Sequence, residues 1–244
     1  MISIKLFKEL NLKGYSMIEA FPGAGLVGAM AGSYIIEKLE MEYVGHIESE
    51  QFPPIAAIHG GVPMYPARLY MDKKTKLIVV LSEFTIPSEL IYPLSMELLS
   101  FIKKYGIARI ISISGMPSTK AGDGVFIATQ SAALLKKANS AGIKPISEGV
   151  IAGISAILMV NSSQMNVPML DLLVEVNPQI MDPKYAELAI GGLNKIMDMS
   201  IDLKDLEEES KVVEAKIRDL MKKMKETHDT YTNATEAAGP SMYA

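Results

Sequence analysis

The run Ile107–Ile113 constrains the fold of this chain more than any other segment. It is almost entirely apolar or β-branched, interrupted by Arg109 and Ser112. Such a run is typical of a parallel strand that is buried on both faces of its sheet. A sheet with two buried faces needs helices on both sides. We therefore expect an α/β fold with Ile107–Ile113 in its interior.

Other segments alternate between strand and helix patterns along the first 200 residues. The expected strands are 15–21, 43–47, 63–70, 77–81 and 170–176, and the expected helices are 28–39, 88–105, 130–140, 150–160 and 183–200. We expect a turn at 114–118 and a buried helix at 150–160. Strands alternating with helices indicate a largely parallel sheet. The sequence thus predicts that residues 1–200 form a three-layer α/β/α sandwich with a mostly parallel sheet.

Composition excludes several classes of function. The 244 residues are 49% hydrophobic and 21% charged, which is typical of a globular protein with a substantial core. A net charge of −4 and only three arginines argue against nucleic acid as a partner. The absence of cysteine excludes disulfides and thiol nucleophiles and fits a cytoplasmic protein. The longest apolar run, 150–160, is too short to span a bilayer, so we expect a soluble protein with no membrane partner.

A heptad pattern begins at the end of the expected sandwich. Apolar residues recur there with spacings of three and four, interrupted by Ser210. The seam residues are Met199, Leu203, Leu206, Val213, Ile217, Leu220 and Met224. This pattern predicts a coiled-coil helix at 201–226 that joins copies of the chain into a homo-oligomer. The alternative is that the apolar stripe folds back on its own sandwich.

The segment 227–244 has the composition of a flexible tail. It consists mainly of Thr, Asn, Ala, Gly and Glu, which bury too little apolar surface to offset the entropy of ordering. Its last residues, Met242, Tyr243 and Ala244, combine a hydrophobic side chain, a tyrosine and a carboxylate. A tyrosine ring fills an apolar slot while its hydroxyl and a carboxylate find polar partners. We expect these three residues to be a docking motif for a partner.

A glycine loop lies between the first expected strand and helix. Gly23, Gly25 and Gly28 match G-x-G-x-x-G, and Glu48 lies about 20 residues beyond, where a dinucleotide-binding fold places its ribose acid. However, a proline-rich hairpin follows instead of further βαβ units. This favours a structural turn with close helix–strand packing. An anion or small-ligand site and a dinucleotide site are the alternatives.

A small-molecule site could form from loops at the ends of the expected strands. Glu83 and Asp123 would form a carboxylate pair there, with Lys120 as a charge partner, because ligands bind at the carboxyl ends of strands in open α/β sheets. The alternative is that all three are solvated loop residues.

Nucleophile and metal motifs are incomplete. The segment 153–157 reads Gly-Ile-Ser-Ala-Ile and lacks the final glycine of a nucleophile elbow. The histidines, His46, His59 and His228, lack metal-ligand spacing. We therefore expect no catalytic residue, no metal and no cofactor.

Several of these segments together resemble the archaeal proteasome assembly chaperone family: the glycine motif at 21–28, the strand at 77–83, the strand and turn at 107–115, and the C-terminal coiled-coil helix. The resemblance implies a phosphorylase-like α/β sandwich used for binding, self-association, and no requirement for ATP. It implies that Met242, Tyr243 and Ala244 insert into pockets between α subunits of the proteasome core particle, during assembly or as a cap. Gly23, Gly25 and Gly28 would then be fold determinants only. The competing hypothesis is an enzyme with a phosphorylase-like or hydrolase-like site at the carboxyl edge of the sheet.

Overall fold

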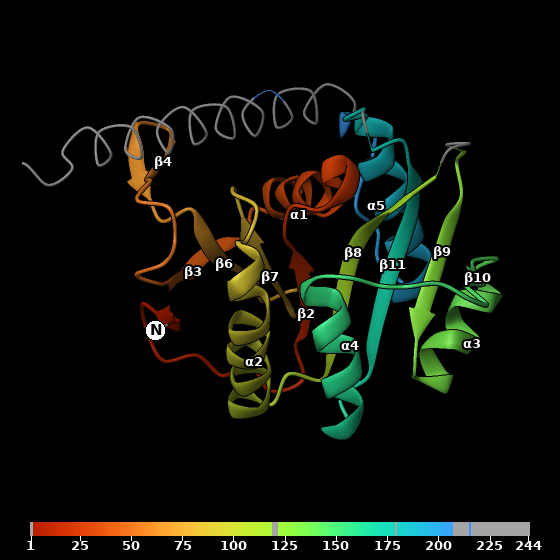
Figure 1. Cartoon of the computed structure of the whole chain (residues 1–244), viewed down its shortest axis with the longest axis horizontal. Helices are drawn as coiled ribbons and strands as arrows, with labels where there is room; N and C mark the ends of the chain where they lie inside the picture. The colour runs from red at the N-terminus through yellow and green to blue at the C-terminus, as the bar shows by residue number, and fades with distance from the viewer. Residues whose placement is uncertain (1, 119–121, 179, 207–214, 216–244) are drawn as a thin grey trace, which may run out of the picture.

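The computed structural model describes residues 2–118, 122–178, 180–206 and 215. Its frame is a nine-stranded sheet with the order β1-β3-β6-β7-β2-β8-β11-β9-β10 (Figure 1). The strands of this sheet are β1 (Ser3–Leu6), β2 (Ser16–Ala20), β3 (Glu42–Glu48), β6 (Ala67–Asp72), β7 (Leu77–Ser82), β8 (Arg109–Pro117), β9 (Val125–Thr129), β10 (Lys144–Pro145) and β11 (Met169–Val176). The helices are α1 (Val27–Lys38), α2 (Ser88–Tyr105), α3 (Ala132–Ser140), α4 (Ile154–Gln164) and α5 (Pro183–Met197). A separate hairpin pairs β4 (Ala57–His59) with β5 (Val62–Met64).

The middle of the sheet is parallel. β2 pairs in parallel with β7 on one side and β8 on the other, and β8 pairs in parallel with β11. Ile110 and Ile111 on β8 are both fully buried, although their side chains point to opposite faces. The predicted parallel strand with two buried faces is confirmed.

The expectation of a mostly parallel sheet was wrong, because the sheet is mixed. β1, β3, β6 and β7 form consecutive antiparallel pairs, and β9 runs antiparallel to β11. The turn between β6 and β7 shows the cause. The Asp72 carboxylate accepts hydrogen bonds from the backbone N–H groups of Lys74 and Thr75. A turn this tight reverses the chain, whereas a parallel pair needs a long crossover.

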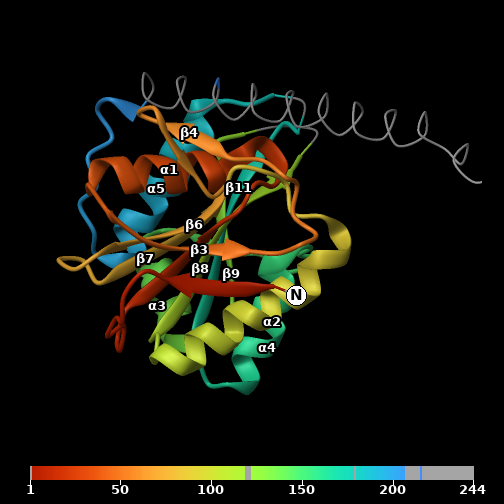
Figure 2. The same cartoon turned by 90° about the vertical axis from the view of Figure 1, so that its left-hand side faces the viewer.

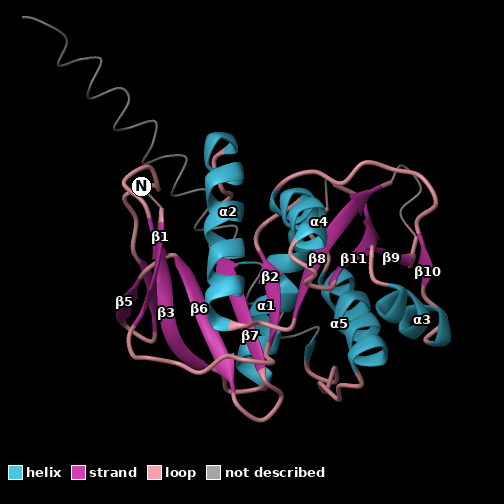
Figure 3. Ribbon diagram, turned by 90° about the horizontal axis from the view of Figure 1, so that it is seen from below, coloured by secondary structure: helices cyan, strands magenta, loops and turns pink. Residues whose placement is uncertain are grey.

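Helices cover both faces of the sheet. On one face α1, α3 and α5 pack against a core that contains Ile18, Val79 and Ile111, and on the other face α2 and α4 pack against Met17 and Ile110. The sheet runs between these two helical layers in Figure 2, and Figure 3 shows α2 and α4 side by side on their face. Within the described residues, no helix has both the length and the apolarity to cross a bilayer.

Two helix ends follow their sequence signals. α2 ends at Gly106, which adopts the left-handed conformation that glycine tolerates best (φ 64°). α5 begins after Asp182, whose carboxylate accepts the Lys184 N–H at 2.9 Å, with Pro183 in the first turn. Both ends lie within three residues of their predicted positions.

The structure corrects two predicted boundaries near the end of β8. The helix expected at 150–160 begins only at Ile154, and Val150 is 95% exposed. Gly153 has φ +81°, which is outside the helical region, so the helix starts after it. The turn expected at 114–118 was also wrong, since β8 stays paired with β11 as far as Pro117.

The segment after α5 packs on its own protomer. Ile201 and Leu206 are buried in the core beside α1 and α5, and Met199 and Leu203 pack against it. The Asn194 side chain holds the segment by bonding both the N–H and the C=O of Ile201 at 3.1 and 2.9 Å.

This arrangement differs from the predicted start of the coiled coil at residue 201. Residues 201–205 are not helical, and Leu206 is only 1% exposed, so it offers no surface to a second copy. For Met199, Leu203 and Leu206 the fold-back alternative therefore holds. The remaining seam residues Val213, Ile217, Leu220 and Met224 lie outside the described residues, as does the tail 227–244 with Met242, Tyr243 and Ala244.

Candidate functional site

A pocket of about 460 Å³ opens at the carboxyl ends of β2 and β8. Its walls come from β2 and the loop after it, the end of β8, the start of α2, and the segment that leads into α4. That segment crosses from β10 to α4 in front of β11 (Figure 1). The volume is typical of sites for small molecules, and the carboxyl edge of parallel strands is where such sites form.

A row of buried polar residues crosses the three central strands below this pocket. Ser112 on β8 stands opposite Glu19 on β2 and opposite Asp171 on β11. Ser112 and Asp171 are fully buried, and Glu19 is 5% exposed and lines the pocket. The side chains share the face covered by α2 and α4, because Met17 and Met169, two residues earlier on their strands, belong to that core.

Burial shifts the titration of both acids. Desolvation raises the pKa of Glu19 to about 7, and the Asp171 charge adds to this, while the nearby Ser112 hydroxyl and the hydrogen bond from the Phe21 N–H (3.1 Å) oppose it. Desolvation likewise raises the pKa of Asp171 to about 6, against the opposing hydroxyls of Ser114 and Ser155. Neither Asp171 oxygen has a hydrogen bond of good geometry within the described chain. Such perturbed acids beside a cleft are typical of functional sites.

The glycine loop forms one wall of the pocket through close backbone contacts. Gly25 has φ 64°, inside a short 3-10 turn (Ala24–Leu26). A Cβ on Gly28 would lie 2.6 Å from the Ile113 carbonyl oxygen, and a Cβ on Gly115 would lie 2.0 Å from that of Ala24. The loop and the end of β8 therefore touch backbone to backbone, which agrees with the predicted structural turn.

We expect Gly115→Ala to destabilise the protein by about 1–3 kcal/mol, because the new methyl group forces the Ala24 carbonyl away from β8. Urea denaturation of the purified variant measures this loss. Gly149→Ala is the matched control, since Gly149 also lines the pocket but a methyl group added to it would meet nothing within 4 Å. The control should change the free energy of unfolding by less than about 0.5 kcal/mol. Equal stability of both variants would contradict the close contact.

The structure contradicts the ribose-acid role of Glu48 on which the dinucleotide alternative depended. β3, which carries Glu48, is separated from β2 by β6 and β7. Glu48 instead accepts a hydrogen bond from the Ser3 hydroxyl at 3.1 Å and pairs with Lys5 at 3.5 Å on β1. The carboxylate therefore lies at the far edge of the sheet and cannot reach a ligand on the loop at 23–28.

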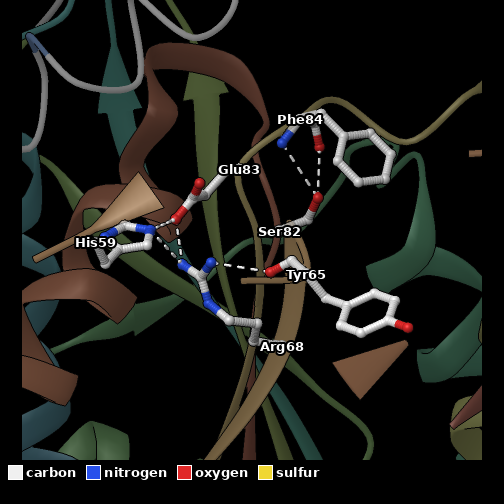
Figure 4. A network of polar contacts seen from close by, with 6 residues as sticks. All are labelled: His59, Tyr65, Arg68, Ser82, Glu83 and Phe84. Carbon is white, nitrogen blue, oxygen red and sulfur yellow. Dashed lines mark hydrogen bonds and ion pairs between the residues drawn. The ribbon is translucent and has the colours of Figure 1, made fainter. Parts of the chain in front are cut away.

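A second polar cluster ties the β4–β5 hairpin to the sheet (Figure 4). Arg68 on β6 forms an ion pair with Glu83 and donates to the Tyr65 carbonyl at 2.9 Å, while His59 Nε2 lies 2.5 Å from Glu83 Oε1. Arg68 is 2% exposed. Burial opposes ionisation of Glu83, but the hydrogen bond from His59 and the charge of Arg68 outweigh it and lower the pKa of Glu83.

The predicted trio of Glu83, Lys120 and Asp123 does not form one site. Glu83 follows β7 and Asp123 precedes β9, and three strands separate these in the sheet. Asp123 instead pairs with Lys184 at 2.6 Å, and Lys120 lies outside the described residues. Neither Glu83 nor Asp123 lines the pocket.

The structure instead identifies Glu19 and Asp171, which the sequence patterns did not single out. Their signal was present, since each is a carboxylate inside a largely apolar strand. Of the histidines, His46 is buried and stacks on Tyr65 with ring centroids 3.6 Å apart. Among the described residues, no group of three His, Cys, Asp or Glu side chains is arranged to hold a metal ion.

The mixed sheet, its two helical layers and the pocket at its carboxyl edge define an α/β protein with a small-molecule-sized cavity. The chain belongs to the PAC2 family, whose model matches residues 17–221. This confirms the family that the sequence motifs indicated.

Solved structures show the same fold. Pyrococcus furiosus PbaA, described as an archaeal homolog of proteasome-assembly chaperone, is 26% identical, with 92% of this chain and 99% of that chain covered and a TM-score of 0.82. P. furiosus PbaB, described as an archaeal proteasome activator, is 22% identical with 90% and 98% covered and a TM-score of 0.74, which shows the fold alone. An uncharacterised protein of Methanocaldococcus jannaschii is 26% identical over 87% of each chain.

Proposed function

We propose that this protein is an ATP-independent proteasome assembly chaperone or cap that binds the α-subunit ring of the core particle. The observation that carries the proposal is the similarity to PbaA, an archaeal homolog of proteasome-assembly chaperone, along nearly the whole length of both chains. The match to the PAC2 family, which includes the motifs at 21–28 and 107–115, supports it.

The docking motif that we propose is Met242, Tyr243 and Ala244. A tyrosine flanked by small or flexible apolar residues inserts into an apolar slot and gives its hydroxyl a polar partner. The residues 227–244 that carry the motif reach at most roughly 60 Å when extended. This length allows one protomer to search for pockets on a neighbouring ring.

Self-association would strengthen such docking. We propose that Val213, Ile217, Leu220 and Met224 form the seam between copies, because Leu206 is already buried in its own protomer. Several tails emerging from one oligomer would occupy several pockets of one ring at the same time. Avidity of this kind raises affinity by about 10²–10⁴ without any new contact.

Deleting Met242–Ala244 is expected to abolish binding to purified proteasome α-subunit rings while leaving the melting temperature and the oligomeric state unchanged. Tyr243→Ala should weaken binding by at least about tenfold, because it removes the ring that fills the slot. Binding to immobilised rings, thermal denaturation and light scattering measure ring binding, melting temperature and oligomeric state.

Tyr231→Ala is the matched control, because it removes a tyrosine from the same C-terminal segment but outside the motif. It should bind as the unmodified protein does. Undiminished ring binding by the truncated protein would rule out the proposed motif, and no ring binding by the full chain would rule out the proposed partner.

A further inference from the structure

The ionisable side chains that line the pocket are acidic. Within the described chain they are Glu19, in the interior, and Glu148, which is exposed, and no Lys, Arg or His lines the cavity. Asp171 lies beneath the floor, beside Ser114 and Ser155, which do line it. Anionic ligands such as phosphates are bound by Arg and Lys clamps, so this lining disfavours them. The charge of the pocket fits a cation.

Among the described residues, no cationic side chain pairs with either of the two buried acids. The groups that influence Glu19 are Ser112, the Phe21 N–H and Asp171, none of which is positively charged. Neither oxygen of the buried Asp171 has a hydrogen bond of good geometry in the described part of the chain, although the Ser114 and Ser155 hydroxyls lie near it. Buried carboxylates are normally paired or hydrogen-bonded, because burying an unpaired charge is strongly unfavourable. The site therefore has unused capacity to accept N–H donors.

Apart from Thr85, Ser114 and Ser155, the rest of the lining is apolar. Ile86 comes from the loop before α2, Ile91 from the first turn of α2, Met116 from β8 and Leu173 from β11. An apolar ligand body would bury surface against these side chains and so remove it from water, which favours binding. A site of this kind combines an apolar wall with a few polar groups that orient the ligand.

We propose that the pocket binds a small organic cation, with an ammonium group at Glu19 and an apolar body against Met116 and Leu173. Glu19 accepts hydrogen bonds from the ammonium group, and Asp171 strengthens the negative field below it. Gly23 also lines the pocket, and the space beside its backbone is open, since a Cβ there would meet nothing within 4 Å.

Phenethylamine tests this proposal directly, with 2-phenylethanol and 3-phenylpropionate as matched neutral and anionic probes. For a fragment of this size we expect a Kd on the order of 1 mM for the amine. At about 20 mM it should raise the melting temperature by roughly 2–6 °C, whereas the alcohol and the carboxylate should shift it by less than about 1 °C. Isothermal titration calorimetry at pH 8 gives the affinities.

Glu19→Gln should weaken amine binding at least about tenfold, because it removes the charge and keeps the shape. Asp171→Asn should weaken it less, since Asp171 acts through the field and not by contact. Glu9→Gln is the charge-matched control at an exposed position away from the pocket, and it should bind like the unmodified protein. Circular dichroism checks that each variant is folded.

Equal binding of the amine and the alcohol, preference for the carboxylate, or full amine affinity in Glu19→Gln would overturn the proposal. So would the absence of amine binding to the unmodified protein at about 50 mM, well above the expected Kd. These measurements use the protein alone, so their outcome is independent of whether it binds proteasome rings.

Discussion

Replacing Glu19 by Gln is expected to raise the free energy of unfolding at pH 8 by about 3 kcal/mol. The pKa of Glu19 rises from 4.5 to about 7 on folding, and each unit corresponds to about 1.4 kcal/mol. The folded protein therefore holds a proton that the unfolded chain releases, so stability falls as the pH rises from about 4.5 to 7 and levels off above. Gln carries no charge at any pH, so the variant does not lose this stability as the pH rises.

Urea denaturation at pH 5 and pH 8 measures the effect. The unmodified protein should lose stability between these values, and Glu19→Gln should lose less. Asp171→Asn should act in the same direction over a lower range, because the pKa of Asp171 rises from 3.8 to about 6. Glu9→Gln, at an exposed position, should retain the pH dependence of the unmodified protein. An unchanged pH dependence in Glu19→Gln would show that the carboxyl is not buried as described.

Replacing Arg68 by Ala is expected to destabilise the protein by about 3–5 kcal/mol at pH 7. Arg68 is 2% exposed, and its guanidinium pairs with Glu83 and holds the Tyr65 carbonyl. Without it, the largely buried Glu83 carboxylate would keep only His59 as a partner among those described. Removing one partner of a buried ion pair leaves an uncompensated charge, which accounts for the size of the loss.

The pH dependence distinguishes this loss from simple loss of packing. The pKa of Glu83 is lowered in the folded protein, so the stability that the pair contributes is present above about pH 4.5 and is lost as the pH falls through the lowered pKa. The deficit of Arg68→Ala should therefore shrink at pH 3. Arg68→Met combined with Glu83→Leu removes both charges and should cost less than Arg68→Ala alone. A deficit below about 1 kcal/mol at neutral pH would contradict the described pair.

The local patterns of the sequence determined most elements of the fold. Apolar runs predicted β2, β7, β8 and β11, because a strand buried on both faces cannot tolerate many polar side chains. Gly106 predicted the C-terminal end of α2, and Asp182 predicted the N-terminal end of α5. Both predictions succeeded because the conformational preference of glycine and the capping preference of aspartate act within a few residues. The predicted start of α4 was wrong. The apolar content of 150–160 suggested a helix from residue 150, but the helix begins only after Gly149 and Gly153.

The tertiary structure alone decided which distant residues meet. Glu19 and Asp171 are far apart in the sequence, and they form one row only because β2 and β11 flank β8 in register. Strand order and register depend on how whole elements pack, and no local pattern contains them. The run Ile107–Ile113 thus predicted a buried parallel strand, while the buried acids and the pocket above them arise from the strands that flank it.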